Sequence, residues 1–317
     1  MNIRNAAAAL AVHIFFALPV AAKLCGDDVD GADVACACGD IVVSDLVLGD
    51  GDPVTSEVCD GDGLILRAAS LYVITVNLAG QTLRGNGRGH GILVMYGGDR
   101  GARVISSPGR ATLAGFDSGV VCSGTDLQLL EGIDVRDVAT DGVRVRGPGL
   151  QVRDVVVNDA GRDGFAFSGR EYRSINNRSH FSARHGFMIM GHEGILSGNR
   201  ATDSGGAGFL VSGADHAIDD CHAVANGKNG LEVVAGGVAI ERCTVEWNGA
   251  NGIEGHGARW RLADNVAQSN GGDGIRARGV GMVDAGGNRG SGNGYLARSD
   301  AVQCLIGGEP CSGGDAP

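Results

Sequence analysis

The stretch NGLEVVAGGVAIERCTVEWNGANGIEGHG, residues 229–257, opens with an Asn-Gly-aliphatic-Glu phrase that returns 22 residues later. The same spacing recurs along the chain in glycines that each precede an apolar residue. These leading glycines are Gly119, Gly142, Gly164, Gly186, Gly208, Gly230, Gly252, Gly274 and Gly294. A period of about 20–50 residues is typical of architectures that stack one structural unit on the next.

Hydrophobic residues within each repeat alternate with other residues, as they do in strands, and do not follow the periodicity of a helix. After a leading glycine the first and third positions are mostly apolar, as in Val143 and Val145 or Leu231 and Val233. Two further short strands follow, and no repeat has room for a crossover helix. The sequence therefore predicts an all-β fold, a single-stranded right-handed parallel β-helix. We expect about ten coils of ~22 residues, with disulfide-stapled caps at both ends.

Stacked coils place equivalent residues above one another at about the inter-strand distance, ~4.8 Å. Phe165, Phe187 and Phe209 are predicted to form an inward aromatic stack. Two further columns fall at bends of the coil. The first holds Asn177, Asn199, Cys221, Cys243 and Asn265, and the second holds Asn226, Asn248 and Asn270. A ladder of asparagine amides can satisfy buried backbone groups, so we predict a structural role for these asparagines.

Disulfides are favoured over a metal cluster for the nine cysteines, because the Cys36-Ala-Cys38 spacing is not that of a metal site. Cys221 and Cys243 occupy one column, where stacked Cα atoms ~4.8 Å apart lie within disulfide range. We predict that these two residues form a bond.

The remaining cysteines lie near the ends of the chain, apart from one. Cys304 and Cys311 are predicted to bond and to staple the C-terminal cap. Three pairings remain open for the N-terminal group, which comprises Cys25, Cys36, Cys38 and Cys59. Cys122 falls on an inward position and is expected to be a buried thiol.

Four segments are expected along the chain. Residues 1–22 resemble a secretory signal peptide, with Arg4 near the start, an apolar stretch from Ala6 to Leu18 and a small-residue cleavage site near Ala22. The segments that follow are a Cys/Asp-rich N-terminal cap (23–63), the β-helix (64–293) and a C-terminal cap with a tail (294–317). We therefore expect a secreted or periplasmic protein.

Acidic residues outnumber basic ones, with 37 Asp and Glu against 26 Lys and Arg, a net charge of −11. Loss of Arg4 with the signal peptide leaves 25 − 37 = −12. An acidic surface repels phosphate backbones, so no nucleic-acid partner is expected. No later stretch approaches the length of a membrane span. We expect a monomer. The residues point to no cofactor with certainty, and Ca²⁺ is the one considered below.

The Asn-Gly units resemble a known family of repeats. The units NGKNGL, WNGANGI and SNGGDGI, with VNLAGQTLRGNG upstream, resemble the right-handed β-helix repeat proteins of the pectate-lyase-like superfamily. Within it, the chain looks most like the NosD-like, or right-handed β-helix domain, group. The resemblance covers residues 64–295. It implies the fold strongly, whereas that fold hosts lyases, hydrolases, epimerases, adhesins and proteins without known activity.

The outward column two positions after the leading glycine is the first place to look for chemistry, because it sets Glu232 beside Glu254. Two carboxylates ~5 Å apart could hold Ca²⁺, or serve as acid and nucleophile of a retaining glycosidase. His256 could supply a base, and Arg276 and Arg278 could contact an anionic substrate. Glu232, Glu254 and His256 are therefore candidate catalytic residues. The alternative is a solvated charge column in which Glu254 pairs with Arg276.

A basic grouping offers a second candidate. Arg144 and Arg146, with Arg170 and Arg173 nearby, could dock uronate carboxylates through bidentate contacts. The alternative is ordinary surface charge.

Two short sequences elsewhere resemble a known catalytic motif, but they are a weaker indication of a site. Asp219-Asp220 followed by Gly255-His256-Gly257 echoes polygalacturonase motifs, but the spacing puts Asp219 and His256 on different faces of their coils. The Asp-Pro-His signature of mannuronan epimerases is absent.

The predicted outward strand face is long and shallow, which suits an extended polymer. We expect the protein to bind or process an extracellular polysaccharide there, a polyuronate included. As an enzyme it would be a polysaccharide lyase, an epimerase or a glycoside hydrolase. The alternative is a non-catalytic structural or adhesion protein of the envelope, in which the β-helix is a rigid spacer.

Overall fold

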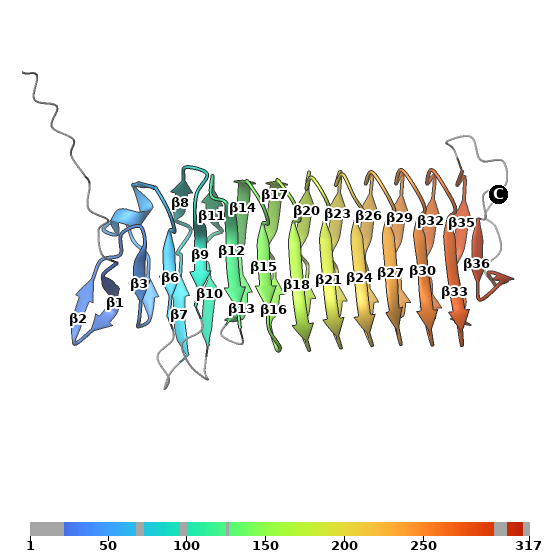
Figure 1. The fold of residues 1–317 in the computed structure, drawn as a ribbon, viewed down its shortest axis with the longest axis horizontal. Coiled ribbons are helices and arrows are strands. Elements are labelled where there is room, and N and C mark those ends of the chain that lie inside the picture. Colours follow the sequence, from blue (N-terminus) through green and yellow to red (C-terminus); the bar gives the residue numbers. More distant parts are fainter. Residues whose placement is uncertain (1–21, 68–72, 96–100, 125–126, 295–302, 313–317) are drawn as a thin grey trace, which may run out of the picture.

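Three β-sheets run the length of the protein in the computed structural model, which describes residues 22–67, 73–95, 101–124, 127–294 and 303–312. Each turn of the chain contributes one strand to each sheet, and the turns follow one another along the long axis (Figure 1). Neighbouring strands in the coils are parallel, as in the pairing of Val143 with Phe165. The predicted parallel β-helix is therefore confirmed.

Sheet 1 has 15 strands and contains the segment after each leading glycine from Gly119 to Gly274. In spatial order its strands are β2 (Ala32–Val34), β1 (Leu24–Val29), β3 (Asp40–Val42), β6 (Leu64–Leu66), β9 (His90–Val94), β12 (Ser118–Ser123), β15 (Val143–Arg146), β18 (Phe165–Arg170), β21 (Phe187–His192), β24 (Phe209–Ala214), β27 (Leu231–Gly236), β30 (Ile253–Ala258), β33 (Ile275–Val280), β36 (Cys304–Ile306) and β37 (Glu309–Pro310). Antiparallel pairs end the sheet on both sides, β1 with β2 and β36 with β37.

Sheets 2 and 3 have 11 strands each. Sheet 2 consists of β4 (Leu46–Val47), β7 (Ile74–Asn77), β10 (Ala102–Ile105), β13 (Leu127–Glu131), β16 (Gln151–Arg153), β19 (Arg173–Ile175), β22 (Ile195–Ser197), β25 (Ala217–Asp219), β28 (Ala239–Glu241), β31 (Arg261–Ala263) and β34 (Val283–Asp284). Sheet 3 consists of β5 (Val58–Cys59), β8 (Thr82–Gly85), β11 (Ala111–Ala114), β14 (Ile133–Val138), β17 (Val156–Ala160), β20 (Arg178–His180), β23 (Arg200–Thr202), β26 (His222–Val224), β29 (Thr244–Glu246), β32 (Val266–Gln268) and β35 (Arg289–Ser291).

Eleven coils are present rather than the expected number of about ten. The first coil is formed by β3, β4 and β5, which lie within the Cys-rich stretch 23–63 and pair with β6, β7 and β8. A one-turn 3-10 helix, η1 (Pro53–Thr55), connects β4 to β5.

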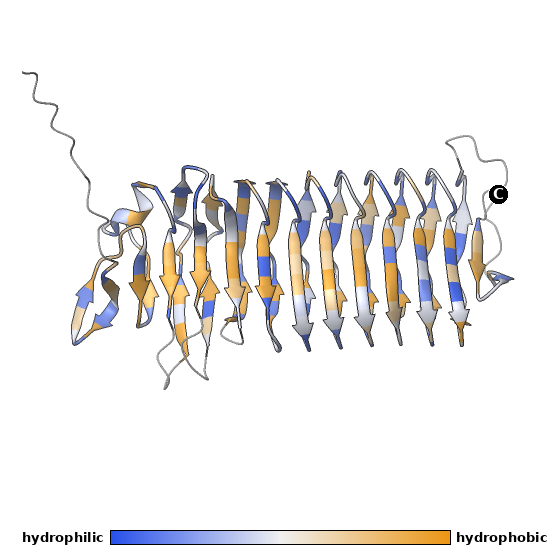
Figure 2. Ribbon diagram, in the orientation of Figure 1, coloured by the Kyte–Doolittle hydropathy of each residue, from blue (hydrophilic) through white to orange (hydrophobic). Residues whose placement is uncertain are grey.

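The core lies inside the tube that the three sheets enclose. Hydrophobic and hydrophilic residues alternate in strands β15, β30 and β33 (Figure 2), and the inward hydrophobic positions of sheet 1 are buried. Phe165 stacks on Phe187 with ring centroids 4.6 Å apart, and Phe187 stacks on Phe209 at 4.7 Å. These distances are those of the coil rise, so one side chain per coil fills the same part of the core.

Both predicted asparagine ladders are formed. Asn226 accepts the backbone N–H of Ser204, and Asn248 in turn accepts that of Asn226. The Nδ2 group of Asn248 donates to the carbonyl of Ala223 in the coil before. Each amide therefore joins coils through buried backbone groups. The ladders also continue one coil further than the sequence analysis followed them, to Asn288 and Asn293.

Four disulfides are present in the described part of the chain. Cys221–Cys243 and Cys304–Cys311 are formed as predicted, and the Cα atoms of the first pair are 4.5 Å apart. The N-terminal group, whose pairing the sequence left open, bonds as Cys25–Cys36 and Cys38–Cys59. Cys122 is buried and belongs to none of the four bonds.

No helix within the described ranges is long and apolar enough to cross a bilayer. Residues 1–21 of the expected signal peptide lie outside those ranges.

Candidate functional site

The outward face of sheet 1 brings the candidate catalytic residues together. Glu232 in β27 pairs in register with Glu254 in β30, and Glu254 pairs with Arg276 in β33. His256 pairs with Arg278, two positions further along the same strands. The predicted columns are present, because the constant coil length keeps equivalent positions aligned.

Each glutamate has an asparagine partner in its own coil. The Nδ2 group of Asn229 donates to Oε2 of Glu232 at 3.3 Å, and Asn251 donates to Glu254 in the same way. Both asparagines stand directly before a leading glycine, three residues ahead of the glutamate. A hydrogen-bond donor on each carboxylate offsets part of the repulsion between stacked like charges.

Arg276 pairs with Asp273, not with Glu254 as the charge-column interpretation expected. Asp273 stands three residues before Arg276 and is buried. A buried carboxylate on the same coil competes better for the guanidinium than the half-buried Glu254 on the neighbouring coil, which already accepts a hydrogen bond from Asn251.

His256 and Arg278 are exposed side by side, and Arg278 forms no ion pair within the described ranges. No group of three or more His, Cys, Asp or Glu side chains there is arranged to hold a metal ion. Glu232 and Glu254 therefore offer a cation two carboxylates and no third side chain of that kind. Asp219 lies in β25 of sheet 2, away from His256 in sheet 1, as the spacing predicted.

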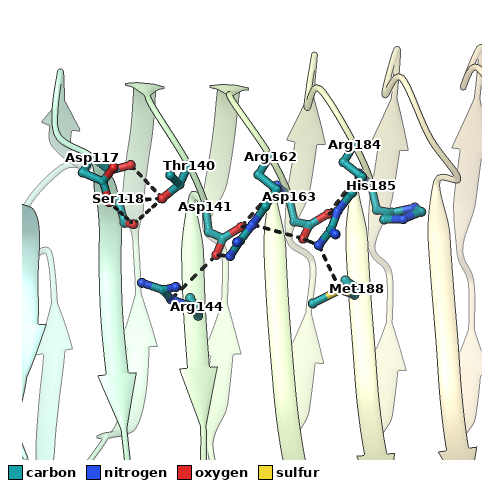
Figure 3. A network of polar contacts seen from close by, with 10 residues as sticks. All are labelled: Asp117, Ser118, Thr140, Asp141, Arg144, Arg162, Asp163, Arg184, His185 and Met188. Atoms are coloured by element: carbon teal, nitrogen blue, oxygen red, sulfur yellow. Dashed lines mark hydrogen bonds and ion pairs between the residues drawn. The ribbon is translucent and has the colours of Figure 1, made fainter. Parts of the chain in front are cut away.

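The middle of this face, around β15 and β18, carries a network of buried ion pairs (Figure 3). The side chain of Asp141 is fully buried and accepts a hydrogen bond from Nε of Arg162 at 2.7 Å and another from Nη2. Nε of Arg144 lies 3.7 Å from the same carboxylate. One coil further on, the buried carboxylate of Asp163 accepts two hydrogen bonds from Arg184.

These ion pairs favour the protonated form of the Arg162 and Arg184 guanidinium groups. The hydrogen bond to Asp141 raises the pKa of Arg162, and that to Asp163 raises the pKa of Arg184. His185 follows Arg184, and burial lowers the pKa of its imidazole. Its Nδ1 accepts the backbone N–H of Ala207 at 3.1 Å, which requires an unprotonated nitrogen.

The residue directly before most leading glycines forms part of a third ladder, which was not predicted from the sequence. Asp141 accepts the backbone N–H of Asp163, and Asp163 accepts that of His185. In later coils Asn229 accepts the N–H of Asn251. The signal was visible in the sequence as an acceptor side chain at one position of most repeats. Its members are Asp141, Asp163, His185, Asn229, Asn251 and Asp273.

A small hollow opens beside the ion pairs. Its volume is ≈ 40 Å³, and it is lined by Arg144, Arg146, Arg162, Ala166, Phe167, Ser168, Met188 and Met190. Ala166 pairs in register with Arg144 on one side and Met188 on the other, so a short side chain between two long ones leaves the space. Arg146 is exposed and has no ion-pair partner in the described part.

The family model of the right-handed β-helix region matches residues 118–258. Together with the eleven stacked coils, this match supports a β-helix repeat family. The chain is a right-handed β-helix repeat protein. A search of curated proteins found no match to this β-helix protein.

Among solved structures, the β-helix protein is similar to two modules from Azotobacter vinelandii. The A-module of the mannuronan C-5 epimerase AlgE6 is 18% identical over 80% of this chain and 77% of that chain, with a TM-score of 0.49. The A-module of AlgE4 is 17% identical over 80% and 78%, with a TM-score of 0.46. A double mutant of the periplasmic alginate epimerase AlgG is 13% identical over 80% of both chains, with a TM-score of 0.46.

The β-helix thus separates the predicted site residues into two groups on one face. Glu232, Glu254 and His256 lie with Arg276 and Arg278 over β27, β30 and β33. Arg144 and Arg146 lie on β15, near the middle of the solenoid. The two further basic residues are elsewhere, Arg170 at the end of β18 and Arg173 on β19 of sheet 2.

Proposed function

We propose that this β-helix protein binds an extended acidic polysaccharide, of the polyuronate class, along the outward face of sheet 1. The observation that carries the proposal is the hollow between the guanidinium groups of Arg144 and Arg146 and the thioethers of Met188 and Met190. A guanidinium fork binds a carboxylate in bidentate geometry, and the methionines offer an apolar surface to the C–H face of a sugar ring.

The balance of charged side chains around the hollow supports an anionic ligand. Asp141 and Asp163 are matched by Arg162 and Arg184, each in a two-point contact. Arg144 is then left with only the long contact to Asp141, at 3.7 Å. With Arg146 it gives this part of an acidic protein an excess of two positive charges.

The size of the hollow favours a chain that lies over the surface. Its volume of ≈ 40 Å³ is far below the ~300–1,000 Å³ of pockets that enclose a whole small molecule. A single carboxylate fits such a space, and the sugar rings remain outside. On the same outward column, His256 lies five coils from Arg146, ~24 Å, and Arg278 lies six coils away, ~29 Å. These two residues provide a second contact for a long ligand.

Binding of uronate oligomers, measured by calorimetry at two salt concentrations, tests the proposal. Arg146→Ala should weaken binding about tenfold and reduce its salt dependence, because a desolvated guanidinium–carboxylate contact is lost. Arg200→Ala is the matched control, since Arg200 lies on sheet 3. Equal losses in the two variants would contradict the site and indicate non-specific attraction.

The processing part of the proposal concerns Glu232, Glu254 and His256. In it Glu254 and Glu232 supply acid and nucleophile or bind Ca²⁺, His256 supplies a base, and Arg276 and Arg278 hold the substrate. The support is their alignment on neighbouring strands.

A polysaccharide panel, with and without Ca²⁺, should show new reducing or unsaturated ends. Glu254→Gln keeps the size of the side chain that Asn251 contacts and should abolish them. Asp203→Asn, on an exposed turn at another corner, is the control. Wild-type rates in Glu254→Gln would contradict the assignment of Glu254 as a catalytic residue.

A structural role in the envelope is the second candidate, because the same glutamates are also explained without chemistry. Asn229 and Asn251 donate hydrogen bonds to the two carboxylates. The asparagine ladders link successive coils, so that the solenoid forms a regular rod. Under this alternative the protein shows no polysaccharide binding in the isotherms and no new chain ends.

Export is part of the proposal and is supported by the four disulfides, which persist in oxidising compartments. N-terminal sequencing of the secreted or periplasmic protein should place the cleavage near Ala22. Light scattering should give the mass of one mature chain.

A further inference from the structure

The corner between sheets 3 and 1 repeats one unusual backbone conformation in seven consecutive coils. The residue there has a positive φ, between 52° and 57° in the seven consecutive coils. These corner residues are Asp137, Asp159, Phe181, Asp203, Ala225, Trp247 and Ser269. Their backbone N–H groups donate to the next coil, as from Phe181 to Thr202 and from Trp247 to Gln268, both at 3.2 Å. The coil therefore imposes the conformation on whatever residue stands there.

Two of the corner residues are unsuited to this conformation. Aspartate tolerates positive φ, whereas bulky aromatic residues adopt it rarely and at a cost. Phe181 and Trp247 nevertheless occupy the corner, and both project into solvent, with exposed fractions of 58% and 56%. Backbone preference does not explain an exposed aromatic ring at this position, so the local preference is contradicted twice in one column.

A wide, shallow hollow adjoins Phe181. Its volume is ≈ 560 Å³, and small residues such as Gly115 and Gly161 form much of its lining. Asp137, Asp159 and Asn86 also line it, together with Phe181. Neither aspartate carboxylate has a hydrogen-bond or ion-pair partner in the described part of the chain, and both residues are exposed.

We propose that this corner binds a neutral glycan, separately from the acidic polysaccharide of sheet 1. An aromatic face stacks on the C–H face of a sugar ring, and carboxylate and amide oxygens accept hydrogen bonds from sugar hydroxyls. Phe181 and Trp247 are three coils apart, ~14 Å. They form the two platforms of a track that a short oligosaccharide spans, and the hollow beside Phe181 holds its end.

The lining chemistry distinguishes this ligand from others. No Arg or Lys lines the hollow, and Asp137 and Asp159 repel a uronate, so an acidic polymer is disfavoured here. A protein partner is disfavoured as well, because Asp203 and Ala225 separate the two rings and leave no continuous apolar patch. Sugar rings without charge match both conditions.

Substitutions with asparagine test the proposal without threatening the fold. Asn prefers the positive φ of the corner, so Phe181→Asn and Trp247→Asn should raise Tm while they remove a platform. The probes are neutral hexasaccharides of glucose, mannose and galactose, with fluorescence of Trp247 and calorimetry as readouts. We expect at least one to bind, about tenfold more weakly in each variant and with no detectable binding in the double variant.

The controls separate this site from the proposed function. Val280→Asn replaces another exposed apolar residue outside the column and should leave neutral-glycan binding unchanged. Uronate binding should be unaffected in Phe181→Asn and Trp247→Asn, and neutral-glycan binding unaffected in Arg146→Ala. The proposal is overturned if no hexasaccharide binds, or if the double asparagine variant binds as tightly as the wild type.

Discussion

Gly255 and Trp260 share one volume of the core, because a Cβ atom at Gly255 would collide with the indole ring of Trp260. The residue in register with Gly255 in the preceding coil is Val233. Trp260 is buried and donates its Nε1 hydrogen to the carbonyl of Ala235 at 2.7 Å. The first glycine of the Gly-His-Gly sequence is therefore a packing residue, and the motif has a structural origin.

Gly255→Val should destabilise the protein by about 1–3 kcal/mol, because it overpacks a filled core. Trp260→Val in the same chain should restore part of the loss, since the preceding coil combines Val233 with Val238 at the equivalent positions. The rest remains because a Cβ atom at Gly255 also approaches the carbonyl oxygen of Val233, at 2.5 Å. Denaturant unfolding of the single and double variants measures both effects. A double variant that is less stable than Gly255→Val would contradict shared occupancy.

The Cys221–Cys243 bond replaces one step of the asparagine ladder, and this substitution is testable. The pair Cys221→Ser and Cys243→Ser should lower stability by about 3 kcal/mol, the value for a loop of this length. The pair Cys221→Asn and Cys243→Asn should lose less, because the amides can join a ladder in which Asn265 already accepts the N–H of residue 243. Thermal unfolding under oxidising conditions compares them. Equal losses would show that the column does not accept asparagine at these coils.

Removal of Arg184 should cost more than removal of the whole Arg184–Asp163 pair. Arg184→Ala leaves a fully buried carboxylate without its hydrogen-bonded cation, a loss of about 3 kcal/mol. The nearest remaining cation is Arg162, whose Nε lies 3.8 Å from Asp163 and whose hydrogen bonds go to Asp141. Adding Asp163→Asn removes that charge and keeps an acceptor for the N–H of His185. The double variant should therefore be more stable than Arg184→Ala in urea unfolding. The opposite order would mean that the carboxylate is adequately solvated.

Stability should fall as the pH decreases through about 6.5, the pKa of an unperturbed histidine. Burial lowers the pKa of His216, and its Nδ1 accepts hydrogen bonds from Tyr172 at 3.1 Å and from the N–H of Gly194 at 3.2 Å. Between the unfolded and the folded pKa the unfolded chain binds a proton that the folded chain does not, so acid favours unfolding. The stability is fully present above that range.

A pH series of Tm for His216→Gln should be flatter than for the wild type. It should not be flat, because burial lowers the pKa of His180 and His185 as well. Tyr172→Phe should keep the wild-type slope, since burial of the imidazole, not the hydroxyl, is the main cause of the lowered pKa. An unchanged slope in His216→Gln would contradict this assignment.

The site was less predictable than the columns that contain it. Alternation and period place Glu232 beside Glu254, but not the hydrogen bonds from Asn229 and Asn251, which depend on how side chains turn at the corner. The pairing of Arg276 with Asp273 was not predictable for the same reason, because it depends on the burial of the Asp273 carboxylate in the turn. The basic hollow likewise arises from a single short side chain, Ala166, between longer neighbours.

What the sequence alone determined is the repeating frame: the fold, the Phe165 stack, the two asparagine ladders at the bends and the Cys221–Cys243 bond. A constant period makes contacts between coils a matter of counting, so local information suffices. Tertiary structure decided what does not repeat, namely the Cys25–Cys36 and Cys38–Cys59 pairs and the room that Gly255 leaves for Trp260. These depend on chain path and side-chain volume in three dimensions, which no period encodes.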